Sequence, residues 1–391
     1  MKRAPSRLLC CALLSGALLG AEAMAADEPV VTPKPEKPSR IRSPDDGQLD
    51  ISGFLDEAYG FVPLVVPITE PAVGIGGAAA LIFIDKQKNA DAGAGFGRPN
   101  LSIVGALGTD NGTQGAFAGD IRHWLDDRVK TMVGVMRASV NLDFYGSGRI
   151  PSLQDNPRAY NLDTEAGLVR GQFRIGQSPV WLGLGYVLAT TKTRFDIAPD
   201  IPGLPDLQGE SRVGGVLPSV TFDSRDNVFT PTAGNYAEVT AGLFDKSLGS
   251  DTDFQRVSLT GIHYQPLARH LSLGVLANSV LSYGDVPFYL RPFINMRGVQ
   301  AMRYQGDKMA QVEAEVRWQF HGRYSVVGFG GFGATRTDGP NGRSSRNVGA
   351  VGAGFRYEIA RKYGLHMGID VARGPDGTAW YVQFGSAWAR P

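Results

Sequence analysis

The feature that most constrains this chain is a set of long segments that alternate between two kinds of side chain. Residues 311–320, QVEAEVRWQF, put valine, alanine, tryptophan and phenylalanine on one face and glutamine, glutamate and arginine on the other. A period of two is the period of a β-strand, and ordinary globular strands have only about 5–6 residues. Segments of roughly ten residues with one apolar and one polar face are typical of transmembrane β-barrels, where the apolar face meets lipid.

The same alternation recurs from about residue 70 to the end of the chain, and turn dipeptides such as Asn111-Gly112 and Asp376-Gly377 separate the segments. An even number of strands fits a bacterial barrel, and closure pairs every backbone amide. We therefore predict an all-β, 16-stranded antiparallel transmembrane barrel over residues 70–391, with a compact soluble sandwich as the alternative. The predicted strands are 73–85, 99–109, 113–125, 128–144, 159–175, 178–194, 210–224, 234–245, 252–267, 270–283, 287–295, 308–320, 322–335, 345–359, 364–373 and 379–388. In the last of them, Phe384 and Trp388 lie on the apolar face and are expected to act as a C-terminal strand signal.

The N-terminal region is expected to direct export. Residues 1–25 combine basic residues, the apolar run LLCCALLSGALLG and small residues before Ala25, which is the pattern of a cleaved signal peptide. The run is shorter than the roughly 20 residues that a membrane-spanning helix needs. Residues 26–48 are rich in proline and charge and are expected to form a disordered periplasmic segment. Residues 49–69 are expected to hold one short helix and a lead-in to the barrel.

The composition excludes several function classes. The formal net charge is +1, without the basic surplus that nucleic-acid binding requires, so no nucleic-acid partner is expected. The five histidines are scattered, with no pair at metal-ligand spacing, and no Gly-x-Ser-x-Gly motif occurs. The acids Asp223 and Asp226 flank Arg225 at a predicted strand end, where an ion-paired turn is a better explanation than a catalytic cluster. We expect no enzyme activity, no metal and no cofactor.

Several blocks of the chain resemble the BamA/TamA family of outer-membrane assembly barrels, also called the bacterial surface antigen type. MRGVQAMRYQGD (296–307), between predicted strands 11 and 12, is similar to the family's sixth extracellular loop with its Arg-Gly-aromatic signature. DSRDNVFTPTAGNYAEV (223–239) resembles a strand–turn–strand block of the family, here with Pro231 and Gly234. ITEPAVGIGGAAAL (68–81), GIDVARG (368–374) and the closing YVQFGSAW resemble the first and last two strands.

This resemblance implies a role for the loop 296–307. In the family the loop folds back into the barrel lumen, and its arginine reaches acidic side chains of the inner wall. By alternation, the acids expected to face inward here are Glu313, Glu315, Glu358 and Asp370. We expect Arg297, next to Gly298, to pair with Asp370 first and Glu358 second, in a two-pronged contact that fixes orientation as well as charge.

Two positions of the chain depart from the family pattern. Gly331 stands in FGGFG (329–333) where relatives often carry an acid, and Val299 stands where the loop signature has an aromatic residue. We call the pairing of Arg297 with the inward acids the latch. These differences predict a rewired latch that lacks one carboxylate and one aromatic packing contact.

The resemblance also implies a function. The expected role is insertion of protein into, or translocation across, the outer membrane of a Gram-negative bacterium, through a weakly paired seam between the first and last strands. The chain would be a short member without periplasmic substrate-binding domains. Expected partners are outer-membrane lipid and lipopolysaccharide, unfolded outer-membrane or secreted polypeptides, and the barrel assembly machinery for its own insertion. The alternatives are a passive pore for small solutes and a structural surface antigen.

Overall fold

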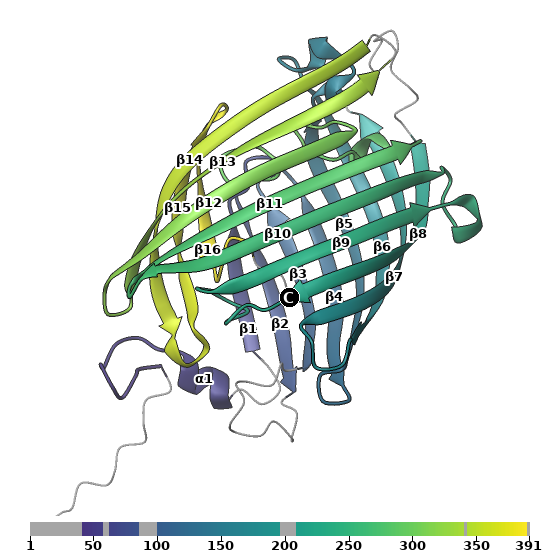
Figure 1. Cartoon of the computed structure of the whole chain (residues 1–391). Coiled ribbons are helices and arrows are strands. Elements are labelled where there is room, and N and C mark those ends of the chain that lie inside the picture. The colour runs from purple at the N-terminus through teal and green to yellow at the C-terminus, as the bar shows by residue number, and fades with distance from the viewer. Residues whose placement is uncertain (1–40, 58–61, 86–99, 196–208, 340–341, 389–391) are drawn as a thin grey trace, which may run out of the picture. The chain divides into compact units, whose positions relative to one another are not determined.

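A computed structural model describes residues 41–57, 62–85, 100–195, 209–339 and 342–388, so the predicted signal peptide lies outside the described residues. Sixteen strands form one antiparallel sheet in which every strand pairs with its neighbours in chain order (Figure 1). The sheet is a nearly closed barrel, as the sequence predicts. Its strands are β1 (Val62–Ile68), β2 (Gly76–Asp85), β3 (Asn100–Thr109), β4 (Gln114–Trp124), β5 (Val129–Phe144), β6 (Arg158–Arg174), β7 (Val180–Phe195), β8 (Gly209–Asp223), β9 (Gly234–Phe244), β10 (Phe254–Ala268), β11 (Leu271–Gly284), β12 (Lys308–His321), β13 (Tyr324–Gly339), β14 (Gly342–Ala360), β15 (Leu365–Gly374) and β16 (Gly377–Phe384).

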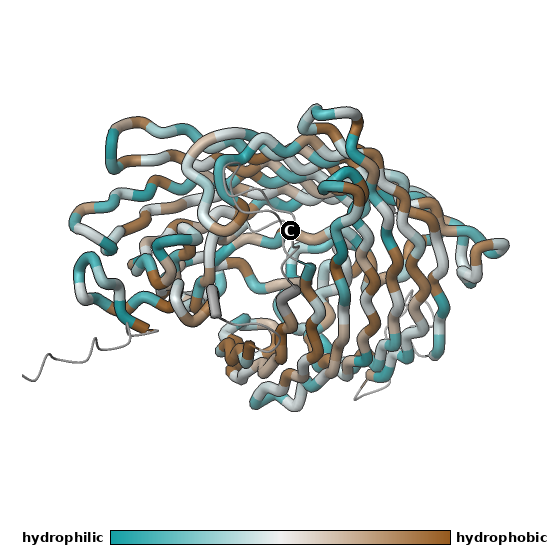
Figure 2. The backbone as a smooth tube through the Cα atoms, turned by 90° about the horizontal axis from the view of Figure 1, so that it is seen from below, coloured by the Kyte–Doolittle hydropathy of each residue, from teal (hydrophilic) through white to brown (hydrophobic). Residues whose placement is uncertain are grey.

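The wall is built from two-faced strands. In β12, Val312, Val316 and Trp318 are exposed on the outer surface, while Gln311 and Glu313 are buried inside. The other wall strands alternate in the same way, so hydrophobic and hydrophilic residues alternate along the tube of the backbone (Figure 2). This is the arrangement that the alternation predicts, with the apolar face outward. No described helix is long and apolar enough to span a membrane.

The number of strands is as predicted, but two strand assignments are wrong. Residues 287–295 form no strand: a 3-10 turn at Phe288–Leu290 is followed by an irregular path inward, because Pro287 and Pro292 cannot donate to a ladder. The true first strand is β1, within residues 49–69, where the prediction placed only a lead-in. Its prolines, Pro63 and Pro67, concealed it, yet an edge strand tolerates proline where the nitrogen faces no partner.

The barrel has an unsealed seam between β1 and β16. These strands lie side by side over part of their length, but no backbone ladder joins them in the described parts of the chain. The seam therefore involves β1, and the strand predicted as first, 73–85, corresponds to the second strand, β2.

An N-terminal segment, residues 41–57, is bound at one end of the barrel, beside the β12–β13 and β14–β15 connections. It contains the short helix α1 (Ser52–Glu57), and the Ile51 amide donates to the Ile359 carbonyl at 2.8 Å. Arg323, in the turn between β12 and β13, is fully buried and contacts Asp46 at 2.7 Å and Asp50 at 2.8 Å. Residues 41–48 are thus folded, which corrects the predicted disorder of 26–48 for its last part; residues 26–40 lie outside the description.

Acidification is expected to release this segment. The hydrogen bond from Arg323 holds the pKa of Asp46 below its ordinary value of 3.8. For Asp50, burial opposes this shift, but bonds from Ser52 and Arg323 still lower its pKa below 3.8. Carboxyls with depressed pKa values stabilise docking above their unfolded pKa, and that stabilisation is lost as the pH falls through the lower, folded values. Protease cleavage within 41–57 should therefore appear only below about pH 4.

The matched variants for this test are two arginines at the same end of the barrel. Arg323→Gln should expose the segment to protease already at neutral pH. Arg361→Gln should leave the segment protected, because Arg361 is about two-fifths exposed and its contact with Asp46, at 3.4 Å, is longer than that of Arg323. Equal protection in wild type and Arg323→Gln would contradict this role of the buried ion pair.

Candidate functional site: a loop latched inside the barrel

The connection between β11 and β12 turns into the lumen instead of projecting outward. Ile294, Met296 and Val299 are buried there against Val280, Met309, Val348 and Ala350 from the inner wall, with Tyr304 packed on the edge of the cluster. Val299 is only 2% exposed. Val299 thus makes an aliphatic packing contact at the position where the family pattern has an aromatic residue.

Arg297 is the charged centre of this loop. Its Nη1 lies 2.7 Å from Asp370 Oδ2 and 2.8 Å from Glu315 Oε2. Its Nε is 4.0 Å from Glu313, and its guanidinium carbon lies 3.5 Å from the centre of the Phe329 ring. A buried guanidinium needs such compensation, because an unpaired charge in this position is costly. The structure thus brings Arg297 together with three of the four predicted acids.

Asp370 has a second cation that the sequence reasoning missed. It is fully buried, and Arg356 on β14 donates to it through both terminal nitrogens, Nη1 to Oδ1 and Nη2 to Oδ2. The two-pronged contact predicted for Arg297 is therefore made by Arg356 instead, while Arg297 uses one nitrogen. The signal was available, because Arg356 is two residues from Glu358 and shares its inward face.

Two further positions of the predicted latch, Glu358 and Gly331, have other neighbours than Arg297. Glu358 does not reach Arg297: it lies at the end of β14 beside a register shift and pairs with Arg361 at 3.2 Å. Gly331 opposes Glu313 on the neighbouring strand. A side chain added at Gly331 would meet the Glu313 side chain at 2.7 Å and the Met296 sulfur at 3.0 Å. Where relatives often carry an acid, Gly331 thus leaves room for the side chains of Glu313 and Met296.

Two glycines let the loop lie directly on the wall. Gly298 has a φ of +86°, which favours glycine, and a Cβ there would lie 3.0 Å from the Ala350 Cβ. Opposite it on β15, a Cβ at Gly374 would lie 1.8 Å from the Gly298 carbonyl oxygen. The Gly298 amide also donates to the Tyr381 hydroxyl on β16 at 2.9 Å. The loop is thereby held against the last two strands.

The block 223–234 forms an ion-paired turn, the simpler of its two interpretations. Arg225 donates to both carboxylate oxygens of Asp223, at 2.8 and 2.9 Å, and lies 4.8 Å from the Tyr236 ring centre. Asp226 accepts the Thr232 amide at 2.9 Å. Gly234 has a φ of +98°, and a Cβ there would meet the Ser224 carbonyl at 2.2 Å. Pro231 is buried where this turn reaches across toward the C-terminal residues.

The C-terminal residues also fold into the lumen. β16 ends at Phe384, and the chain turns at Gly385 (φ +74°), where the Ser386 amide donates to the Phe229 carbonyl. Trp388 then packs into a cluster with Tyr236, Ile262, Tyr264 and Leu276. The prediction that Trp388 belongs to the last strand is therefore wrong, and the strand ends at Phe384 instead. The turn after Phe384 explains the error, since alternation does not report a reversal of direction.

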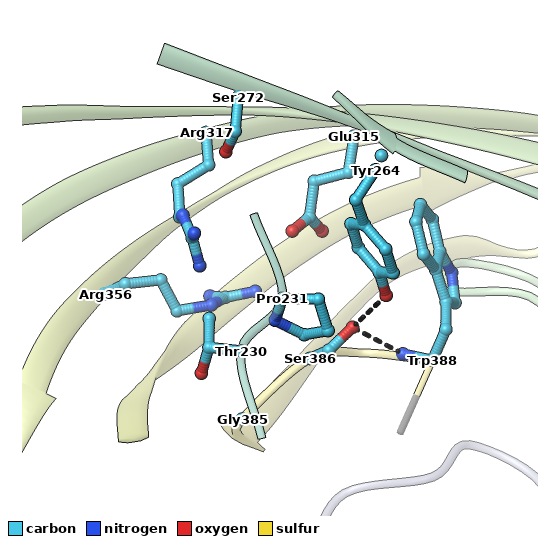
Figure 3. A pocket seen from close by; sticks show the side chains of 11 residues that line it. Thr230, Pro231, Tyr264, Ser272, Glu315, Arg317, Arg356, Gly385, Ser386 and Trp388 are labelled. Atoms are coloured by element: carbon cyan, nitrogen blue, oxygen red, sulfur yellow. Dashed lines mark hydrogen bonds between the residues drawn. The ribbon is translucent and has the colours of Figure 1, made fainter. Parts of the chain in front are cut away.

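The tail encloses a small polar cavity with the inner wall. Arg317, Arg356, Glu315 and Ser386 point toward one another around it (Figure 3). Ser386 bonds the Tyr264 hydroxyl at 3.0 Å and accepts the Trp388 amide at 3.2 Å. The cavity volume is about 20 Å³, which is room for about one water molecule. The tail therefore packs closely on this part of the inner wall, and Glu315 and Arg356 of the charge cluster line the cavity beside it.

Trp388 is expected to hold the tail inside. Trp388→Ala removes a buried indole whose loss costs about 3–5 kcal/mol, so the tail should leave its cluster. A cysteine introduced by Ala387→Cys would report this as faster maleimide labelling. Trp380→Ala is the matched control, because Trp380 lies on the same terminal region but is 43% exposed on the outer surface. Unchanged labelling in Trp388→Ala would contradict an anchoring role.

The fold and the inward loop together define a class of protein, the transmembrane β-barrels whose lumen holds an arginine-bearing loop beside an unsealed seam. An Omp85 superfamily domain matches residues 96–375, so the chain belongs to the Omp85 superfamily, whose barrels reside in the outer membrane. No curated protein sequence matches the chain.

Solved structures show the same fold at low sequence identity. BamA from Haemophilus ducreyi lacking POTRA domains 1–3 is similar with a TM-score of 0.56 and 12% identity, over 84% of this chain and 70% of that chain. CdiB from Escherichia coli gives 0.56 and 10%, over 82% and 61%. CdiB from Acinetobacter baumannii gives 0.54 and 11%, over 83% and 59%. The chain therefore spans about three-fifths of the length of the two CdiB structures.

Proposed function

We propose that this Omp85 barrel takes part in inserting protein into the outer membrane, or moving protein across it, through the seam between β1 and β16. One observation carries the proposal: the inward loop bonds to both sides of that seam. The Gly298 amide donates to Tyr381 on β16, and the Ala301 amide donates to Glu70, just after β1, at 3.3 Å. Arg303 adds an ion pair to Asp376, in the β15–β16 turn, at 3.2 Å.

The edges of the seam suit reversible opening. Pro63 and Pro67 of β1 have no amide hydrogen, so this strand offers few donors toward β16. Strand edges that are not zipped together can pair with an incoming extended segment. In this mechanism the loop acts as a clasp. While it bonds both edges it limits their separation, and its release lets a substrate strand enter.

The position of the loop changes the environment of the Glu70 carboxylate. Glu70 lies in the β1–β2 connection, and burial raises its pKa above the ordinary value of 4.5, although the amides of Ala301 and Ala72 oppose that shift. A partly desolvated carboxylate of this kind gains most from the two amide donors that face it. Withdrawal of the loop removes one of them, which gives the clasp two distinguishable states.

Locking the seam is the direct test. Val65→Cys on β1 would be combined, in turn, with Thr378→Cys, Trp380→Cys or Val382→Cys on β16, and each pair joined by a short crosslinker. The two native cysteines, Cys10 and Cys11, both lie in the predicted signal peptide. In proteoliposomes, insertion of an added unfolded outer-membrane protein should stop on crosslinking and resume on reduction.

A pair at a sealed strand junction provides the control. Val312 and Phe332 face each other directly across β12 and β13, so Val312→Cys with Phe332→Cys should crosslink without affecting insertion. Full insertion activity with the seam crosslinked would refute passage of the substrate between β1 and β16. The alternative of a passive pore has less support, because the loop and the tail occupy part of the lumen with buried clusters.

A further inference from the structure

The outer wall over β5–β8 carries an abrupt boundary between apolar and charged residues. Directly paired positions on four neighbouring strands form a row on the outer surface: Arg137, Glu165, Thr190 and Arg212. The side chains of Arg137 and Glu165 are 70% and 65% exposed and lie 3.4 Å apart. The next row toward the strand ends adds Lys192 and Glu210, which pair at 3.2 Å.

Below this row the outer surface is apolar. The outward residues there include Val133, Val135, Val169, Phe173, Leu182, Leu184, Leu188 and Val220, all of them exposed. From Val129, the first residue of β5, to Arg137 is eight residues, or about 27 Å along a strand. At the usual barrel tilt this is about 20 Å along the membrane normal, close to the height of the lipid-facing band. The charged row therefore lies at headgroup level.

The lengths of the connections between strands show in which leaflet of the membrane the charged row lies. Arg137 lies toward the end of β5 that leads into the connection 145–157, on the same side of the barrel as the long connection between β11 and β12. In bacterial barrels the long loops face outward and the short turns face the periplasm. The row is therefore in the outer leaflet.

A groove begins at Arg137 and runs along the apolar surface. It has a volume of about 640 Å³, and its floor is made of small outward residues, Ala116, Ala118 and Gly167, between the larger Val104, Val135 and Leu188. A second depression of about 470 Å³ continues past Arg137 on its other side, toward Gln114, Ser139 and Asp163. An apolar groove with a charged and hydroxylated head has the shape and polarity of a bound amphiphile.

We propose that this groove is a binding site for a phosphorylated glycolipid of the outer leaflet. Its acyl chains would lie over Ala116, Ala118 and Gly167, and a headgroup phosphate would accept hydrogen bonds from Arg137. Guanidinium–phosphate contacts are strong and geometrically selective. Glu165 competes with the phosphate for Arg137, and the remaining polar groups, Thr190, Ser139 and Asp163, can bond sugar hydroxyls. The occupant is a glycolipid rather than a glycerophospholipid because the head region extends over two rows of polar residues.

The test is lipid retention by the folded barrel. The purified protein is incubated with lipid A, or with phosphatidylglycerol as the comparison lipid, and bound lipid is counted by native mass spectrometry. Wild type should retain lipid A. Arg137→Gln, which removes the phosphate donor, and Ala118→Leu, which fills the groove, should each lower the retained fraction about tenfold. Arg137→Lys should keep part of it, and Glu165→Gln should raise it.

A second groove gives the matched control. It has a volume of about 380 Å³ over β9–β12, and its outward floor includes Ala277 with no charged residue of the row beside it. Ala277→Leu should leave lipid A retention unchanged. Equal retention in wild type, Arg137→Gln and Ala118→Leu would overturn the site, as would an equal loss in Ala277→Leu. Equal retention of phosphatidylglycerol would overturn its assignment to a glycolipid. The heat-modified gel mobility of each variant verifies that the barrel is folded.

Discussion

Replacing Arg297 with alanine should lower the temperature at which the folded barrel converts to the unfolded form on semi-native gels. The substitution removes the cation shared by Asp370, Glu315 and Glu313, which are buried together on the inner wall. Breaking a buried ion pair by deleting one partner costs about 3–5 kcal/mol, and here Glu313 and Glu315 would be left without their ion-pair partner. The stacking on Phe329 is lost as well. We expect this to be among the most destabilising single changes in the loop.

Two further variants sharpen this prediction. Arg297→Lys should have an intermediate effect, because an ammonium keeps the charge beside Asp370 and Glu315 but loses the stacking of the guanidinium on Phe329. Arg336→Ala should have an effect of about 0–1 kcal/mol, since Arg336 and its partner Asp338 are both well exposed. A transition temperature for Arg297→Ala that matches Arg336→Ala would show that the loop charge is dispensable.

Adding one methyl group at Gly374 should displace the loop. In Gly374→Ala the new Cβ would lie 1.8 Å from the Gly298 carbonyl oxygen, so one backbone must move. Overpacking commonly costs about 1–3 kcal/mol, and we expect a value at the upper end because the methyl has no rotatable bond and meets a backbone carbonyl. The displaced loop should become sensitive to trypsin at Arg297 or Arg303, which limited proteolysis and mass spectrometry would detect.

The control for Gly374 is another strand glycine with free space around it. A Cβ at Gly328 on β13 would meet no atom within 4 Å, so Gly328→Ala should leave both the loop and the melting behaviour unchanged. If trypsin cleaves the loop equally in Gly374→Ala, Gly328→Ala and wild type, the close approach of Gly298 to the wall does not hold the loop in place.

The wall was predictable because lipid and lumen impose a strict alternation on every strand between them. β12, with its exposed Val312 and buried Glu313, shows this directly. The prediction failed where that constraint is absent. β1 is a short edge strand interrupted by Pro63 and Pro67, and 287–295 is an extended apolar run that lies inside the barrel and pairs with no strand.

The site was predictable only in part, for a related reason. Alternation shows which acids face inward, and it placed Asp370, Glu313 and Glu315 on the same surface. It gives no information on height within the barrel, so it could not separate Glu358, at the strand end, from Asp370. The contacts of Tyr381 and Glu70 with the loop, and the path of Trp388, depend on how the chain reverses after a strand, for which the alternation carries no signal.

The shared carboxylate has a consequence for how firmly the clasp is closed. Arg297 Nε and Nη2 have no hydrogen-bond acceptor among the described residues, so this side chain is bound through one nitrogen of a guanidinium that has three. If the loop withdraws, Asp370 still has both bonds from Arg356 and does not become an isolated buried anion. Asp370 therefore stays paired and in place when the loop leaves. In such a barrel the loop can dissociate from the inner wall and rebind repeatedly, because its binding site on the wall keeps its structure.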